Sequence, residues 1–397
     1  MDDVLKGPYY ARSRRYLILY GQWPYQDLGI VIFCQILMML GTLSSFVPHC
    51  INVYEALDDF QYVVKGTPSL LFYVQLYAKN LFGFISRRKI KKVLDGIQRD
   101  FRVHAADELE VLDSYSRTAS RFNYFYAACM FGVAWSFSTL PLVLHLMDVL
   151  VPLNETRLQQ KPRPMTYHIG ALDDNMPVII LHSYFADVLS MILIVGLDTL
   201  YLSLAYHACA LFVIVAKRAR GAIDRRGEGV GPSDGRSGDR DAHYPNCVKT
   251  VVAHQYALEF VGTIELAFSS LNLISIGCSV VPLAFVAFTV LVSKDSPDER
   301  IRYFLYAFAE VVHLFYYNWP GEKIREHSLL VYKVCYDGNW YEEEFGLKCQ
   351  KLINLVMIRS QRPCIITAGK MYELGLKNFA AVVKVAMSYL TVLSSIM

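Results

Sequence analysis

The sequence has few of the features of a secreted domain or an enzyme. Its nine cysteines are odd in number and form no C-x-x-C pair, and only Cys50 falls near an expected outer loop, so we expect neither a disulfide framework nor a metal site. The serines, histidines and aspartates of its apolar segments lie too far apart for a catalytic motif. We therefore predict no enzyme activity, no cofactor and no nucleic-acid partner.

Charged residues are also scarce, and the fraction of apolar residues is correspondingly high. Only 19 % of the 397 residues are charged and the formal net charge is +3, whereas 54 % are hydrophobic, 13 % are aromatic and the mean hydropathy is +0.28. This composition is too apolar for an ordinary soluble protein. We predict an all-α polytopic membrane protein with seven transmembrane helices, over residues 28–47, 68–85, 122–147, 177–216, 256–292, 301–319 and 365–394.

The basic residues orient these spans. Of the 39 lysines and arginines, 28 lie before the first span or after the second, fourth and sixth, and only six lie in the segments on the other side. The positive-inside rule then predicts a cytoplasmic amino terminus and an extracellular carboxyl terminus, the reverse of a G-protein-coupled receptor. Residues 1–27 contain no cleavable signal, so the first span is expected to direct insertion. The only N-x-S/T sequon begins at Asn154 in an expected outer loop, which makes Asn154 a candidate glycosylation site.

Several segments predict structure on the cytoplasmic side. The apolar positions of residues 87–121 predict an amphipathic helix that continues the second span. Residues 221–246 are rich in glycine and charge and predict a flexible inner loop. The fourth span is about twice as long as a bilayer core requires. We expect spans four, five and seven to extend together into a cytosolic helical platform.

The fourth span also carries ionisable residues inside an apolar run. They are His182, Asp187, Asp198 and His207. Intramembrane charges are functional candidates by default, so a ligand or proton role stays open. Because Asp198 and His207 lie toward the inner end, we favour interhelical hydrogen bonds at the membrane edge.

The last span has a polar face. Ser388, Val392, Ser395 and Ile396 recur with helical spacing, and Lys384 lies one turn earlier on that face. Small residues at this spacing suit close helix packing. They also suit a helix whose copies line a pore, and both interpretations are open.

The last quarter of the chain carries family-specific motifs, with weaker matches at Tyr20–Gly21 and Trp23–Pro24. They are Asn318, Pro320–Glu322, Ser328, Trp340–Tyr341, Arg359–Ser360 with Arg362–Pro363, Thr367–Lys370, Leu376, Asn378–Phe379 and Ser388–Leu393. These motifs resemble those of the insect odorant (olfactory) receptor family. Within the family they resemble its ligand-tuning subunits, in particular those of Hymenoptera.

The resemblance implies a channel subunit in the plasma membrane of a sensory neuron dendrite. Family members form tetramers around one pore, so we expect residues 1–319 to form the ligand-binding helices, residues 320–362 a cytosolic anchor segment and residues 363–397 the pore-lining final helix. In this scheme Trp340–Gln361 is the cytosolic half of the last helix and Pro363 the break. Val392 corresponds to a hydrophobic gate, with Lys384, Ser388, Ser395 and Ile396 beside it.

The expected partners are a small volatile hydrophobic ligand, the lipid bilayer and odorant co-receptor subunits. By analogy the volatile binds in the outer half, between spans two, three, four and six. The candidate ligand residues are Phe72, Tyr73, Phe131, Trp135, Ser138, Tyr184, Val188, Met191, Tyr303 and Tyr306. For each of them, ordinary helix packing is the alternative.

Lys384 suggests a heteromeric pore. Four copies would place four like charges together, which opposes cation flow, so we expect this chain to need the co-receptor. The second inner loop is too short for the co-receptor itself. A gustatory receptor channel of the same superfamily is the nearest alternative, although its carboxyl-terminal signature is missing. A secondary transporter is a weaker one, because the chain shows no paired internal repeats.

Overall fold

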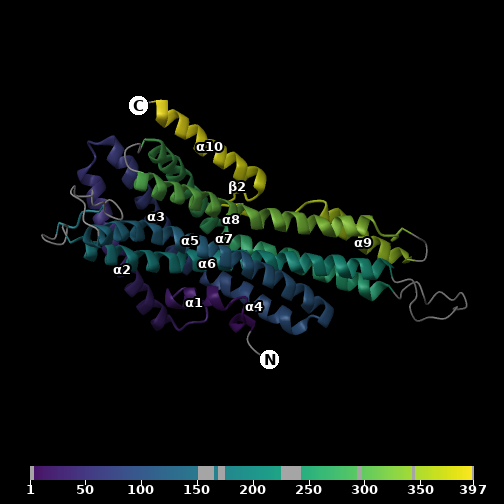
Figure 1. Ribbon diagram of the computed structural model, residues 1–397. Coiled ribbons are helices and arrows are strands. Elements are labelled where there is room, and N and C mark those ends of the chain that lie inside the picture. Colours follow the sequence, from purple (N-terminus) through teal and green to yellow (C-terminus); the bar gives the residue numbers. More distant parts are fainter. Residues whose placement is uncertain are drawn as a thin grey trace, which may run out of the picture.

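The structure is a computed structural model that describes residues 4–150, 165–168, 175–224, 243–292, 297–341 and 345–395. Nearly all of these residues are helical (Figure 1). The elements in chain order are η1 (Val4–Lys6), α1 (Ala11–Leu19), α2 (Leu28–Glu55), α3 (Phe60–Ile85), α4 (Arg87–Val103), α5 (Ala106–Leu150), α6 (Met176–Asp224), α7 (Tyr244–Val292), α8 (Pro297–Tyr336), α9 (Leu347–Ser360), β1 (Thr367–Ala368), β2 (Tyr372–Glu373) and α10 (Leu376–Ser395).

The seven predicted spans correspond to seven long helices, α2, α3, α5, α6, α7, α8 and α10. Four of them, α2, α5, α6 and α7, are long and apolar enough in the described residues to cross a membrane by length and composition. The predicted all-helical fold is therefore confirmed. Its physical basis is that a helix satisfies every backbone hydrogen bond within its own segment, which lipid requires.

Helix α6 forms the centre of the bundle. It packs against α1, α2, α3, α5, α7 and α8, and nearly every side chain from Leu189 to Ala216 is buried. In contrast, α2 exposes most of its apolar side chains, among them Phe33 and Leu40, and it lies on the opposite edge of the bundle from α10 (Figure 1). An all-round apolar helix in the centre and a lipid-facing helix at the edge are what burial in a membrane bundle predicts.

The amphipathic segment after the second span forms a helix of its own. Helix α3 ends at Ile85 and α4 begins at Arg87, so α4 does not continue the second span as expected. Instead Ile90, Val93 and Leu94 are buried, and α4 packs against α7. A break lets the apolar stripe of α4 face the bundle, which a straight continuation of α3 would not.

Four helices extend together beyond the length that a bilayer requires. Helix α6 has 49 residues, roughly 73 Å, against a hydrocarbon core of about 30 Å. The end of α6 pairs with the start of α5, where the Arg218 guanidinium contacts the Glu108 carboxylate at 2.6 and 2.8 Å. Helices α7 and α8 lie beside them, with α9 packed on both. The expected platform named the fourth, fifth and seventh spans. The structure extends the third and sixth spans, α5 and α8, as well, whereas α10 has only 20 residues and is not among the extended helices.

The final helix begins later than expected. Residues 363–375 are not helical; they contain a short hairpin, β1 paired with β2, and α10 starts only at Leu376. Helix α7 satisfies the hairpin backbone: the Glu265 carboxylate accepts the N–H of Thr367 at 2.8 Å, and the Ser269 carbonyl accepts that of Gly369 at 2.9 Å. These partners, which lie about 100 residues away in sequence, make the hairpin more favourable than a continuous helix.

Gly369 gives a direct test of hairpin docking. Its φ is +62° and a Cβ there would lie 2.5 Å from Leu273, so Gly369→Ala should destabilise the protein by about 1–3 kcal/mol. Gly262→Ala on α7 is the control, since a Cβ there meets nothing within 4 Å. Thermal unfolding in detergent measures both. Equal midpoints for the two variants would contradict the docking.

Candidate ligand-binding and gating sites

A fully buried ion pair lies at the middle of the bundle. Lys79 on α3 places its Nζ 2.9 and 3.1 Å from the two carboxylate oxygens of Asp198 on α6, and both side chains are 0 % exposed. Tyr126 on α5 donates to the same carboxylate at 2.6 Å, and the Tyr317 hydroxyl of α8 also donates to it. Four helices thus meet at one carboxylate.

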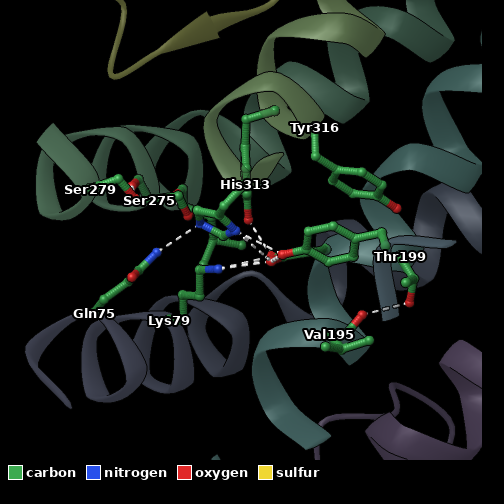
Figure 2. Close-up of polar contacts among 12 residues, drawn as sticks. Gln75, Lys79, Val195, Thr199, Ser275, Ser279, His313 and Tyr316 are labelled. Carbon is green, nitrogen blue, oxygen red and sulfur yellow. Dashed lines mark hydrogen bonds and ion pairs between the residues drawn. The ribbon is translucent and has the colours of Figure 1, made fainter. Parts of the chain in front are cut away.

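A histidine extends this cluster. The Nδ1 of His313 on α8 lies 2.7 Å from the Tyr126 hydroxyl, and its Nε2 lies 3.0 Å from the amide nitrogen of Gln75 (Figure 2). Both ring nitrogens therefore have partners. Figure 2 shows Gln75 and Lys79 on the same face of α3, directed toward His313.

A second group of hydrogen bonds joins α1 to the cluster. The Tyr316 hydroxyl donates to the Asn123 Oδ1 at 2.5 Å, and the Asn123 amide donates to the Thr199 carbonyl at 3.1 Å. The Ser13 hydroxyl of α1 donates to the Thr199 Oγ1 at 2.8 Å. Rings of Tyr126 and Tyr316 stack with centroids 3.8 Å apart, which joins the two groups.

The interhelical bonds predicted for Asp198 and His207 are present. The His207 Nε2 lies 2.9 Å from the Asp100 carboxylate of α4, and His182 contacts Tyr167 and Ser44 at 2.7 and 2.9 Å. Sequence reasoning missed Lys79 and His313. The sequence did contain a signal for both residues, because a lysine or a histidine inside an apolar span needs a polar partner.

Several candidate ligand residues gather next to the polar cluster. Met191, Phe131 and Phe72 pack in one apolar cluster that also contains Tyr126 and Tyr316. Toward the outer end, Phe137 packs edge to face with Tyr303 and Tyr306 at centroid distances of 6.2 and 5.8 Å. Helices α3, α5, α6 and α8 contribute these side chains, which are the second, third, fourth and sixth spans.

Polar groups lie beside these aromatic rings. The Ser138 hydroxyl donates to the Asp187 carboxylate at 3.5 Å, and the Tyr184 hydroxyl contacts that of Thr139. The Tyr306 hydroxyl donates to the Pro68 carbonyl at 3.3 Å.

Other candidates point elsewhere. Tyr73 donates to the Ser45 hydroxyl at 2.9 Å and packs on Phe46, so it faces α2. Trp135 is 46 % exposed and contacts Phe131, whereas Val188 is half-buried on α6. The structure does not bring all ten candidates to one surface.

The gate candidates lie on an exposed face of α10. Lys384, Ser388 and Val392 are exposed, Val392 at 55 %, and the Ser388 hydroxyl donates to the Lys384 carbonyl at 2.9 Å. The side chain of Ser395 and all of Ile396 lie outside the described residues. Asn154 and most of the predicted loop 221–246 do so as well.

Helix α8 holds the start of α10. The Asn318 Oδ1 accepts from the Tyr372 hydroxyl at 3.1 Å and from the Gly375 N–H at 3.2 Å. One turn further, the Glu322 carboxylate accepts the Leu376 N–H at 3.1 Å, which caps the first turn of α10. The helix that bears Tyr303 and Tyr306 thus fixes the amino end of α10.

Comparison with known proteins identifies the architecture. The family model described as 7tm odorant receptor matches residues 59–387. This chain belongs to the odorant receptor family.

Individual odorant receptors are distant relatives. The chain is 23 % identical to odorant receptor Or2 of Anopheles gambiae over 88 % of its own length and 92 % of that protein. It is 22 % identical to odorant receptor 9a of Drosophila melanogaster over 73 % and 69 % of the two chains. Members of this family are receptors and not enzymes, so the prediction that this chain has no enzyme activity is confirmed. The prediction of a membrane protein is confirmed as well.

Solved structures show the same odorant receptor fold. The olfactory receptor OR5 of Machilis hrabei in complex with eugenol superposes with a TM-score of 0.79 at 14 % identity, covering 98 % of this chain and 97 % of that one. A second OR5 structure gives a TM-score of 0.68 at 16 % identity, with both chains fully covered.

The buried ion pair can be tested by a double-mutant cycle. Lys79→Met or Asp198→Asn alone should destabilise this odorant receptor by about 3–5 kcal/mol, because each leaves a partner charge buried and unpaired. The double variant should lose clearly less than the sum of the single variants. Thermal unfolding in detergent measures the cycle. Additive losses would contradict direct coupling.

The cap on α10 gives a local test. Glu322→Ala should speed amide hydrogen exchange at Leu376 and in the following turn, since the carboxylate no longer accepts that N–H. Glu326→Ala is the matched control, because Glu326 is half-exposed and pairs with Lys323 on the surface. Exchange in α10 that is the same in both variants would show that Glu322 does not cap the helix.

Proposed function

We propose that this chain is the odorant-binding subunit of a ligand-gated, non-selective cation channel. In the proposal a small volatile hydrophobic molecule binds among α3, α5, α6 and α8 in the outer half of the bundle. The observation that supports it is the connectivity of α8. That helix carries Tyr303 and Tyr306 near one end, and its Asn318 and Glu322 hold the start of α10.

The polar cluster separates these two ends of α8. His313 and Tyr317 lie between Tyr306 and Asn318 and bond to α3, α5 and α6. A ligand that shifts the outer end of α8 therefore strains buried hydrogen bonds that are costly to leave unmade. In the proposal α8 moves together with the helices bonded to it, which keeps these bonds intact and transmits the shift to α10.

The proposed gate is a ring of Val392 side chains. An apolar ring closes a pore by excluding water, and its dilation admits ions. Lys384 lies two turns earlier and is exposed. Two ammonium groups roughly 10 Å apart repel by about 2 kcal/mol at an effective dielectric constant near 20, so four copies would oppose cation entry.

This repulsion supports a heterotetramer with odorant co-receptor subunits. One copy of Lys384 among three subunits of another type adds one charge instead of four. The proposed location is the plasma membrane of the sensory dendrite, where a cation current would depolarise the neuron.

Whole-cell recording tests the proposal. Cells that express this chain with the odorant co-receptor should give odour-evoked current against a broad volatile panel, whereas cells that express it alone should give none. Surface labelling confirms delivery in both cases. Robust odour-gated current from this chain alone would overturn the heteromeric pore.

The same recordings locate the ligand site. Met191→Ala should shift the effective odorant concentration by about tenfold, because Met191 is 7 % exposed within the apolar cluster. Met147→Ala on α5 is the control, since Met147 is 43 % exposed. An unchanged concentration response in Met191→Ala would remove that cluster from the binding site.

A further inference from the structure

Two cations flank a pair of aromatic rings along the edge formed by α1, α4 and the turn between α1 and α2. The Arg14 guanidinium lies over the Trp23 ring at 5.9 Å, the Trp23 and Tyr25 centroids are 5.7 Å apart, and the Lys91 ammonium lies over Tyr25 at 5.2 Å. We call these four residues the cation–aromatic ladder. It joins α1 to α4 although about 75 residues separate them in sequence.

The turn that carries the two rings is fixed in place. The Arg87 guanidinium donates to the carbonyls of Pro24, at 3.3 Å, and Gln26. The Gln26 amide donates to the Ile18 carbonyl at 3.0 Å. Because α1 and α4 both bind the turn, the ladder has a preformed geometry.

The surroundings of the ladder are strongly basic. Helix α4 has seven lysines and arginines and two aspartates, and α1 has three arginines and no acid. Of the aspartates, Asp95 accepts from the Tyr25 hydroxyl, and buried Asp100 is engaged by His207 and Tyr256, each at 2.9 Å. Asp27 is exposed at the start of α2.

Four cations of this edge have no acidic partner among the described residues. In the described part of the chain, no carboxylate forms an ion pair with Arg14, Arg15, Arg88 or Lys91. The burial of Ile90, Val93 and Leu94 directs the charged face of α4 outward. Neighbouring Lys92 and Arg99 do have partners, in Glu259 and the Tyr256 ring.

Exposed apolar surface begins where the ladder ends. Helix α2 starts at Leu28, and Leu28, Ile32 and Phe33 are 58 %, 47 % and 68 % exposed. Only 22 % of the most apolar window of α2 is buried. Trp23 is only 4 % exposed and supports the ladder from inside, whereas Tyr25 is 38 % exposed and is the ring at the surface. Cations, then the Tyr25 ring, then aliphatic side chains follow the order of headgroup, interface and acyl chain in a phospholipid leaflet.

We propose that the cation–aromatic ladder, with Arg15 and Arg88, binds the headgroup of an anionic phospholipid of the cytoplasmic leaflet, whose acyl chains lie along α2. Basic residues at this depth attract anionic headgroups, and the exposed Tyr25 ring suits the interfacial level. The bound lipid would join α1, α4 and α2 at a point where protein contacts leave the cations unmatched. This site lies apart from the odorant and gate residues, so it does not depend on channel function.

Lipid titration of the full chain in detergent tests the site. The probes are phosphatidylinositol 4,5-bisphosphate and phosphatidylcholine, with adducts counted by native mass spectrometry. We expect saturable binding of the anionic lipid and none above background for phosphatidylcholine. In Arg14→Gln with Lys91→Gln the anionic lipid should bind roughly 30-fold more weakly, about fivefold for each cation removed. Lys91→Arg should retain binding.

The control removes the same charge elsewhere. Arg325→Gln with Lys333→Gln loses two exposed cations of α8 and should leave lipid binding unchanged. Equal weakening in the two double variants would show diffuse attraction to positive charge and would overturn the site. Equally tight binding of soluble inositol trisphosphate would overturn the part played by the acyl chains. A thermal midpoint near wild type in each variant establishes that the protein is folded.

Discussion

The carboxylate of Asp198 is the point on which this bundle depends. A charge without access to water is costly, and here Lys79, Tyr126 and Tyr317 supply one cation and two hydroxyl donors from three other helices. The Asp198 carboxylate keeps all three partners only if α3, α5, α6 and α8 keep one relative register. Apolar contacts alone would allow these helices to slide, because lipid is as apolar as leucine and gives little preference between packings.

The same helices carry the residues of the proposed function. Helix α8 passes through the cluster at His313 and Tyr317, and it then fixes α10 through Asn318 and Glu322. Helix α10 is therefore attached to a helix that is itself bonded to three others at the cluster, while Lys384 and Ser388 on α10 are exposed. In the proposed function, a small shift shared by the bonded helices reaches α10 through α8 without breaking buried polar contacts.

Much of the fold could be predicted from the sequence, and the failures have a common cause. The long apolar runs located seven helices because each run satisfies its own backbone in lipid. The hairpin at Thr367 was missed, since its partner Glu265 is about 100 residues away. The sixth span was predicted to end at residue 319, yet α8 continues through Pro320 to Tyr336. Residue type suggested Trp135 for the pocket, but only the structure shows that Trp135 is itself 46 % exposed.

Composition, the order of spans and their charge asymmetry are local properties of the chain, so the sequence by itself determined the membrane fold, the orientation we expect for it and the polar face of the last helix. Which side chains meet depends on how helices rotate about their axes, and that rotation is set by contacts between distant residues. Only the tertiary structure therefore decided that Lys79 forms an ion pair with Asp198, that α8 caps α10, and that Arg14 and Lys91 flank one aromatic pair.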